Sequence, residues 1–252
     1  MNGMVRGMFK DSKPIWVNTD NNEMNGFYAF HFPFKNDGGR VLSVRIAVCD
    51  AYRIYCNGKF VASGPARCGE GYFRQDSIQC TDSLRRGKNT LTVIAAGYNV
   101  NCFEYLCQEP FVWLEAELDG QIVARTNETT LVFKVIEHEQ FTQRYSFQRI
   151  FTEVWHLNDE LERIIEGTGG QKEVKVITRE PKKILFRNSP YPHYRCKEGF
   201  LIGGGEMSLD KRDFVKKDIS GMPFLEPREF FQAYPTHLLS SNLYHDICCT
   251  RT

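Results

Sequence analysis

Short hydrophobic runs separated by turn residues dominate the stretch from residue 27 to residue 135. In one of them, Ile54 and Cys56 fall on one face of an extended chain and Tyr55 falls on the other, because side chains alternate along a strand. This alternation indicates an antiparallel sheet with one packed face. Seven runs rich in β-branched and aromatic residues predict strands at 27–34, 41–48, 52–56, 91–96, 111–118, 121–124 and 130–135.

The residues between these runs favour tight hairpins. Asn57-Gly58 and Asp119-Gly120 supply the positive φ angles that two-residue hairpin turns require. Residues 36–39, with the order Asn-Asp-Gly-Gly, form a third turn signal. Together the runs and turns predict a β-sandwich of the jelly-roll or galactose-binding-like kind over residues 10–155.

The pattern changes after residue 155. Asn158 or Asp159 can cap a short helix, and Gly167 can end it. A short strand is expected at 174–177. The predicted fold class is therefore mainly β, with the sandwich followed at residues 156–252 by a smaller mixed β-rich module that carries one short helix.

Composition and charge exclude several classes of protein. The 252 residues are 42% hydrophobic and 25% charged, as in ordinary globular proteins. Because 32 basic residues balance 31 acidic ones, the phosphate-binding charge of a nucleic-acid-binding protein is missing. The sequence contains no run of about 20 apolar residues that would span a membrane, and no signal peptide is visible at its start. We therefore expect a cytoplasmic protein, or a periplasmic or secreted one if the true start lies upstream.

Cysteines and histidines give no metal or cofactor signal. The nine cysteines form no CxxC pair, so Cys49, Cys56 and Cys80, which lie in or beside strand-like runs, are expected to be buried thiols. The six histidines never occur in an HxH or HxxxH arrangement. Nucleophile elbows and phosphate-binding glycine loops are also missing from the sequence. We expect neither a cofactor nor a metal.

Carboxylates are abundant but cannot be assigned a catalytic role from the sequence. Glycoside hydrolysis uses two carboxyl groups about 5–9.5 Å apart, and a sequence does not show that separation. Solvated charges at strand edges are the commoner origin of such residues. The available candidates are Glu104, Glu109, Glu115, Glu117 and Glu153.

Five segments in a fixed order resemble the N-terminal region of bacterial α-L-rhamnosidases. Residues 52–67 combine a tyrosine-rich strand, an Asn-Gly hairpin and a Gly-Pro turn, 72–76 hold an aromatic-x-x-Asp element, and 84–91 hold a Leu-x-x-Gly-x-Asn strand entry. Residues 145–154 and 184–192 are also similar to segments of those enzymes. The resemblance implies a non-catalytic β-sandwich region of a glycoside hydrolase.

The chain also departs from that family. In such rhamnosidases the acid and base carboxylates lie on an (α/α)₆ barrel after the sandwiches, around an Asp-Cys-Pro-like stretch and a Gly-Trp. This chain contains neither sequence. The resemblance therefore implies a chain truncated before the catalytic barrel, inactive by itself, with no catalytic residue to carry over. A separate or downstream catalytic domain is an expected partner.

Rhamnose-containing glycans are the other expected partner, bound weakly by rings and polar groups of the sandwich. A self-contained glycosidase that uses sandwich carboxylates such as Glu104 and Glu153 is one alternative. A purely structural or interaction β-sandwich is another. The expected sugar-binding residues are the rings of Trp16, Tyr52, Tyr72, Tyr98 and Trp113, taken to be exposed, and the polar side chains of Arg67, Asp76 and Asn99.

Overall fold

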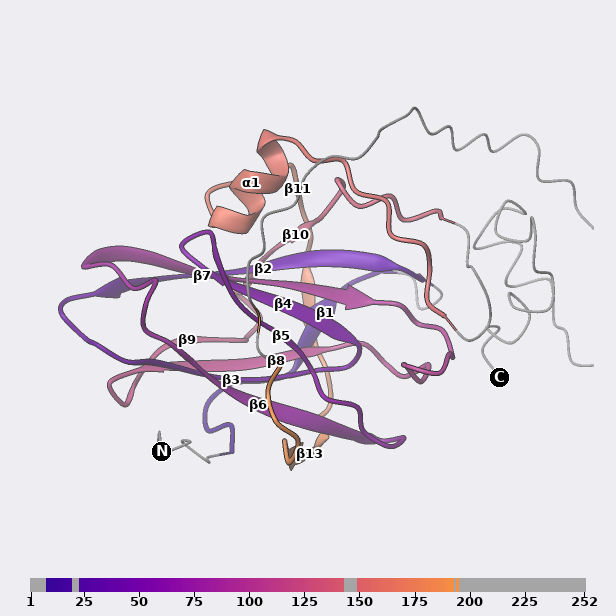
Figure 1. Cartoon of the computed structure of the whole chain (residues 1–252), viewed down its shortest axis with the longest axis horizontal. Helices are drawn as coiled ribbons and strands as arrows, with labels where there is room; N and C mark the ends of the chain where they lie inside the picture. The colour runs from indigo at the N-terminus through magenta and orange to yellow at the C-terminus, as the bar shows by residue number, and fades with distance from the viewer. Residues whose placement is uncertain (1–7, 20–22, 143–148, 193, 195–252) are drawn as a thin grey trace, which may run out of the picture.

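The computed structural model describes residues 8–19, 23–142, 149–192 and 194, which form thirteen strands and one helix. The strands form two facing sheets (Figure 1). One sheet contains β1 (Ile15–Val17), β3 (Leu42–Val48), β6 (Tyr72–Cys80), β8 (Val112–Leu118), β9 (Gln121–Arg125), β12 (Val176–Thr178) and β13 (Lys183–Phe186). The other contains β2 (Gly26–Asn36), β4 (Ala51–Cys56), β5 (Lys59–Gly64), β7 (Gly87–Gly97), β10 (Leu131–Lys134) and β11 (Lys172–Glu173).

The strand order of the first sheet is β12-β1-β8-β3-β6-β13, with β9 beside β8, and that of the second is β11-β10-β2-β7-β4-β5. Pairing is antiparallel except between β13 and β6. All seven strands expected from the hydrophobic runs are present, as β2, β3, β4, β7, β8, β9 and β10. The predicted mainly-β sandwich is therefore confirmed, while its jelly-roll connectivity stays a prediction.

Alternating side chains fill the space between the sheets. Phe30 of β2 and Ile46 of β3 are fully buried in one apolar cluster, together with Ile54. Full burial of such a side chain stabilises the fold by about 1.5–3 kcal/mol. The expected alternation in β4 is confirmed, since Cys56 joins Ile54 in this cluster and Tyr55 packs on the opposite face.

Both predicted hairpin turns are confirmed. Asn57 and Gly58 have φ angles of 50° and 82° between β4 and β5, and Asp119 and Gly120 have φ angles of 47° and 89° between β8 and β9. Positive φ at both central positions is the geometry that matches the twist of paired strands.

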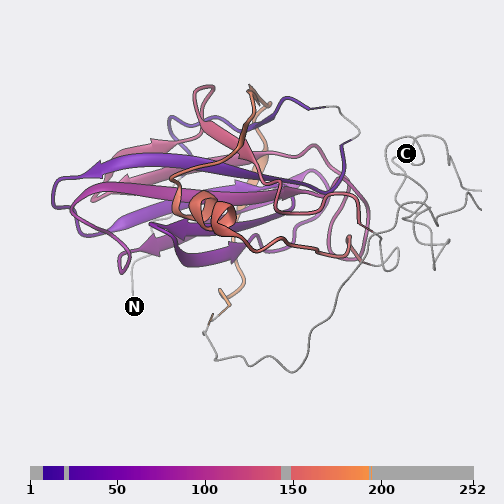
Figure 2. The ribbon, with the colours of Figure 1, turned by 90° about the horizontal axis from the view of Figure 1, so that it is seen from above.

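Helix α1 (Asp159–Glu166) covers the outer face of the six-stranded sheet (Figure 2). Asn158 caps it by accepting a hydrogen bond from the Leu161 N–H at 2.9 Å, and Gly167 ends it with a φ of 74°. Leu161 and Ile164 pack into a second apolar cluster on that face. The predicted helix and both of its ends are confirmed.

The strands that follow the helix extend the two existing sheets. Strand β11 pairs with β10, β12 with β1, and β13 with β6. The strand expected at 174–177 is β12 and starts two residues later. The boundary between modules 10–155 and 156–252 stays a prediction, because residues 195–252 lie outside the described residues.

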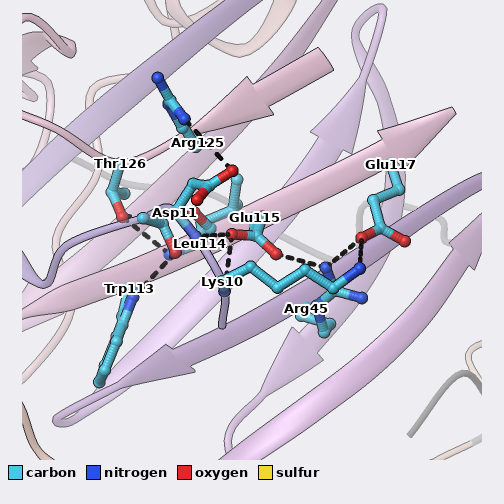
Figure 3. A network of polar contacts seen from close by, with 10 residues as sticks. Lys10, Asp11, Arg45, Trp113, Leu114, Glu115, Glu117, Arg125 and Thr126 are labelled. Atoms are coloured by element: carbon cyan, nitrogen blue, oxygen red, sulfur yellow. Dashed lines mark hydrogen bonds and ion pairs between the residues drawn. The ribbon is translucent and has the colours of Figure 1, made fainter. Parts of the chain in front are cut away.

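A buried ion triad lies on the outer face of the seven-stranded sheet, under the segment 9–13 (Figure 3). The Arg45 guanidinium contacts the carboxylates of Glu115 and Glu117, the latter at 2.6 Å. Glu115 also accepts the backbone N–H groups of Lys10 and Asp11, at 3.1 and 2.9 Å. These contacts hold the pKa of both carboxyl groups below their ordinary value, although burial of Glu115 opposes this. The expectation that Glu115 and Glu117 are solvated is wrong, because the sheet and this segment enclose them.

The buried triad predicts a large effect of Glu115→Gln. Loss of one carboxylate leaves the buried Arg45 charge undercompensated, so the free energy of unfolding in urea should fall by about 3–5 kcal/mol. Glu128→Gln is the matched control, because Glu128 pairs with Lys13 where both side chains are 61% exposed, and it should cost no more than about 1 kcal/mol. Equal effects of the two substitutions would contradict the structural role of the triad.

Two histidines are buried around the second apolar cluster. His31 donates from Nε2 to the Ile164 carbonyl at 3.0 Å. His138 stacks on Phe27, with ring centroids 3.9 Å apart, and neither of its ring nitrogens has a hydrogen-bond partner among the described residues. Burial lowers the pKa of each imidazole from 6.5 to about 4. Both rings are therefore neutral in the folded chain at pH 7.

Acidification should unfold the protein through these groups. Between pH 6.5 and about 4 the unfolded chain binds a proton that folded His138 cannot, so the contribution of His138 to stability is complete above pH 6.5 and falls by about 1.4 kcal/mol per pH unit below it. His138→Phe fills the same stacked position without a titrating group, so its urea midpoint should fall less between pH 6.5 and 4.5 than that of the parent. His156→Gln, at an exposed position, should leave the parental pH dependence unchanged. A parental slope in His138→Phe would contradict the assignment.

Candidate functional site

A cavity of about 670 Å³ opens at the end of the sandwich where β2 and β8 begin and β7 ends. Its wall is more polar than apolar. It combines one indole with amide, carboxylate and guanidinium groups from segments that are far apart in the sequence. Among its lining side chains are those of Trp16, Glu23, Asn99, Asn101, Gln108, Glu109 and Arg179.

A smaller pocket of about 260 Å³ lies next to this cavity and shares Leu106 and Gln108 with it. Arg67, Tyr72 and Glu104 also line it. The two hollows are therefore separated only by the loop 98–111, which joins β7 to β8. We call the two hollows together the rim cleft.

Hydrogen bonds fix the loop that separates the two parts of the rim cleft. The Tyr98 N–H donates to Asp50 at 2.7 Å, and the Asn99 amide donates to the Glu23 carbonyl at 2.8 Å. Farther along, Asn101 accepts the Cys107 N–H at 2.8 Å. The Gly71 N–H donates to the Gln108 side chain at 2.7 Å. These contacts hold the walls of the rim cleft in place before any ligand arrives.

Three charged groups of the larger cavity, those of Glu23, Glu109 and Arg179, are already paired. Glu109 lies 2.8 Å from Arg179 and 2.5 Å from Lys182. Glu23 accepts from the Tyr28 hydroxyl at 2.6 Å and pairs with Lys134 at 3.1 Å. Burial opposes ionisation of Glu23, but these two partners together hold its pKa below the ordinary value. Glu23 is therefore ionised and accepts hydrogen bonds near neutral pH.

Asp50 is the exception among the carboxyl groups of the cleft. Burial raises its pKa from 3.8 to about 6, against the backbone hydrogen bonds from Tyr98 and Asn99. The same carboxyl group accepts the Tyr98 N–H and so fixes the loop 98–111. Titration of Asp50 therefore acts on the contact that shapes the rim cleft.

The structure contradicts the expected exposure of three rings. Trp16, Tyr52 and Tyr98 are at most 3% exposed. Trp16 packs edge-to-face on Tyr28 at 5.5 Å between the sheets, and part of its indole reaches the cavity wall. Residue type alone does not distinguish an aromatic ring of the core from one that binds a ligand. Here all three rings are buried.

The other predicted site residues fall in different places. Arg67 and Tyr72 lie together in the smaller pocket, and Tyr72 is 44% exposed. Asn99 lies with Trp16 in the larger cavity. Trp113 lies away from both, on the outer face of the seven-stranded sheet, where Phe9 stacks on it at 4.4 Å and Ser12 accepts its Nε1–H at 2.9 Å. Sugar binding by these residues stays a prediction.

Asp76 and Tyr52 form an internal clamp. The Tyr52 hydroxyl donates to Asp76, and Arg187 reaches the same carboxylate at 3.2 Å. Arg187 also stacks on Tyr191 at 4.4 Å. This arginine comes from the segment after β13, 111 residues farther along the chain. A side chain at Gly64 would collide with both Asp76 and Tyr52, so the clamp also explains this glycine.

Glu23, Asn101, Gln108 and Arg179 are among the residues of the larger cavity that the sequence did not predict. One available signal was the connection between the strands expected at 91–96 and 111–118. A loop of that length without secondary structure is uncommon and often functional. Arg179 and Glu23 had no local signal, since only the fold brings them to the same rim.

Metal and membrane signals are missing from the described part of the chain. Among these residues, no group of three or more His, Cys, Asp or Glu side chains could hold a metal ion. The described residues form one helix, α1, and it is not long and apolar enough to cross a bilayer.

The fold and the rim cleft define a two-sheet β-sandwich protein with a preformed polar cavity at one end. No protein-family model and no curated protein matches the sequence. The solved structures that share the fold include two rhamnosidases. The GH78 family rhamnosidase of Bacillus sp. GL1 matches 73% of this chain with a TM-score of 0.61 and 22% identity, and the α-L-rhamnosidase from Aspergillus terreus matches 68% with a TM-score of 0.50 and 14% identity.

The chain spans about a fifth of the length of these two enzymes, 20% and 21%. The likeness to an α-L-rhamnosidase region that the five sequence segments predicted is thus confirmed at the level of the fold. A lectin from Pleurotus ostreatus matches 50% of the chain at a TM-score of 0.38, which is too low to indicate function.

The titration of Asp50 gives a test of the loop geometry. The folded chain keeps a proton on Asp50 up to about pH 6, whereas the unfolded chain loses it near 3.8, so the parent loses stability as pH rises through this window. Asp50→Asn keeps an acceptor for Tyr98 but carries no charge. We therefore subtract the unfolding free energy of the parent from that of the variant. As pH increases from 4 to 6, this difference should rise by about 1.4 kcal/mol per pH unit. A constant difference would contradict a buried, titrating Asp50.

Proposed function

We propose that this chain is a non-catalytic, carbohydrate-binding portion of an α-L-rhamnosidase-like glycoside hydrolase, and that the rim cleft holds the sugar. The observation that carries the proposal is the preformed polar cavity at the strand ends. Its volume of about 670 Å³ falls in the range of about 300–1,000 Å³ typical of small-molecule sites. A separate or downstream catalytic domain would supply turnover.

The wall of the cavity has the chemistry that a sugar requires. Sugar hydroxyls both donate and accept hydrogen bonds, and the amides of Asn99, Asn101 and Gln108 can do the same. The carboxylate of Glu109 and the guanidinium of Arg179 add strong acceptors and donors. The indole of Trp16 is 2% exposed and adds only its edge to the cavity wall, as a small apolar contact for a C–H group of a deoxyhexose.

The smaller pocket extends the proposed site. Tyr72 exposes its ring there and Arg67 its guanidinium, next to the loop that also bounds the larger cavity. An oligosaccharide could place one residue in each hollow across Leu106 and Gln108. Rhamnose-containing glycans are the ligands that the fold likeness supports.

The carboxylates favour binding over hydrolysis. Retaining and inverting glycosidases need one carboxyl group with a raised pKa as the general acid. Glu23 has a lowered pKa and Glu109 is bound by two cations. Asp50 has a raised pKa, but it is only 2% exposed and accepts the Tyr98 N–H, so its carboxyl group serves the loop and not a substrate. Glu104 and Glu153, the pair considered for a self-contained glycosidase, are engaged by Arg67 at 3.7 Å and Arg53 at 3.5 Å.

A calorimetric and NMR titration tests the binding. With L-rhamnose and a rhamnosyl disaccharide at millimolar concentration, amide signals of the loop 98–111 should shift. Gln108→Ala should weaken binding at least about ten-fold, because a buried sugar hydroxyl would lose its partner. Gln79→Ala, at an exposed position of β6, is the control and should bind as the parent does. No shift with either sugar, or equal affinity of both variants, would refute the proposal.

An activity assay separates this proposal from the enzyme alternative. Purified full-length chain should not release nitrophenol from nitrophenyl α-L-rhamnoside. Turnover that Glu104→Gln or Glu153→Gln abolishes would establish the self-contained glycosidase instead, because only a reacting carboxylate gives that pattern.

A further inference from the structure

Two cysteines face each other across the sandwich at the end opposite the rim cleft. Cys56 is the last residue of β4 in the six-stranded sheet, and Cys80 is the last residue of β6 in the seven-stranded sheet. Both lie in the apolar cluster between the sheets, where Cys56 is 0% and Cys80 3% exposed. They therefore belong to different sheets but to one core.

The two thiols are in direct contact and are reduced in the structure. A side-chain hydrogen bond joins them. The backbone around them is fixed, because the Asn57 amide donates to the Ser83 carbonyl at 2.7 Å and the Thr90 N–H donates to Asn57 at 3.0 Å. These bonds tie the end of β4 to the loop after β6, and so hold together the two backbone segments that carry Cys56 and Cys80.

The geometry points to Cys56 and Cys80 as a site of disulfide formation that covalently joins the two sheets. The other described thiols have different neighbours. Cys49 donates to the Gln108 carbonyl at 3.7 Å and Cys107 to the Asn99 side chain at 3.3 Å, both at the rim cleft. The Cys56–Cys80 pair is thus set apart by its position in the core between the two sheets.

The reaction requires a disulfide oxidant, for which a low-molecular-weight disulfide such as oxidised glutathione suffices. The Cys56 thiolate attacks one sulfur of the oxidant, forms a mixed disulfide and releases one reduced thiol. The Cys80 thiolate then attacks the Cys56 sulfur and releases the second. Two thiols lose two protons and two electrons, and the oxidant gains both as two free thiols.

Either of the two thiols can react first, and the balance of the reaction is the same. Since both sulfurs are buried, exchange with the oxidant takes place before the sheets close. The disulfide should form during folding in an oxidising medium and stay absent in a reducing one.

Refolding with mass spectrometry tests the inference. The full chain is unfolded, then refolded with either oxidised or reduced glutathione, alkylated and digested with trypsin. After oxidative refolding, the peptide 54–59 should be linked to the peptide 75–85, each of which contains one cysteine. The linked pair should be about 2 Da lighter than the sum of the two free peptides. Alkylated Cys56 and Cys80, or their linkage to Cys49, Cys68, Cys102 or Cys107, would overturn it.

The thermal midpoint of the parent chain provides a second readout. A cross-link that closes a loop of this length should raise the thermal midpoint of the oxidised chain by about 5–10 °C over the reduced chain. Adding a phosphine reductant to the unfolded protein before refolding should remove the difference. Cys80→Ala should show no oxidation-dependent shift, whereas Cys68→Ala, at a half-buried position, should keep it. Equal midpoints of oxidised and reduced parent would contradict the proposed site.

Discussion

The burial of two sheet faces against each other controls the rest of this structure. Strands β2 and β7 pair over eleven residues, from Gly26 opposite Gly97 to Asn36 opposite Gly87. Because side chains alternate with a period of two, this register decides that Phe30 faces the core and His31 faces helix α1. A slip by one residue would reverse both faces. The strand ends that the register aligns form the rim, and the loops at that rim build the polar cavity.

The outer faces of the sheets are closed by polar contacts as well as apolar ones. On one side, Arg45 and its two glutamates lie under the segment 9–13, and on the other, α1 and His138 cover the six-stranded sheet. These buried charged and titrating groups make the fold sensitive to pH in a way that its apolar core alone would not. The protein is therefore held together by non-local contacts between segments about 70 to 130 residues apart.

Much of the fold could be predicted from local sequence, because β-branched runs and positive-φ turn residues act over a few positions. Strand β6 could not, since its polar residues hide the alternation. Asp76 is buried there only because Arg187 comes from 111 residues farther along to pair with it. In the same way, Asn99 was predicted as a site residue, but its neighbours Glu23 and Arg179 reach the cavity through the fold. Trp16, Tyr52 and Tyr98 show the converse, since rings that could stack on a sugar fill the core.

The central claim is that the rim cleft is a carbohydrate site on a rhamnosidase-like sandwich. A crystal structure of the chain soaked with a rhamnosyl disaccharide tests it most directly. The account predicts density for at least one sugar ring within hydrogen-bond distance of Asn99 and Gln108, beside Trp16 in the larger cavity. An empty cavity at saturating sugar, or a sugar bound on another face of the sandwich, would contradict it.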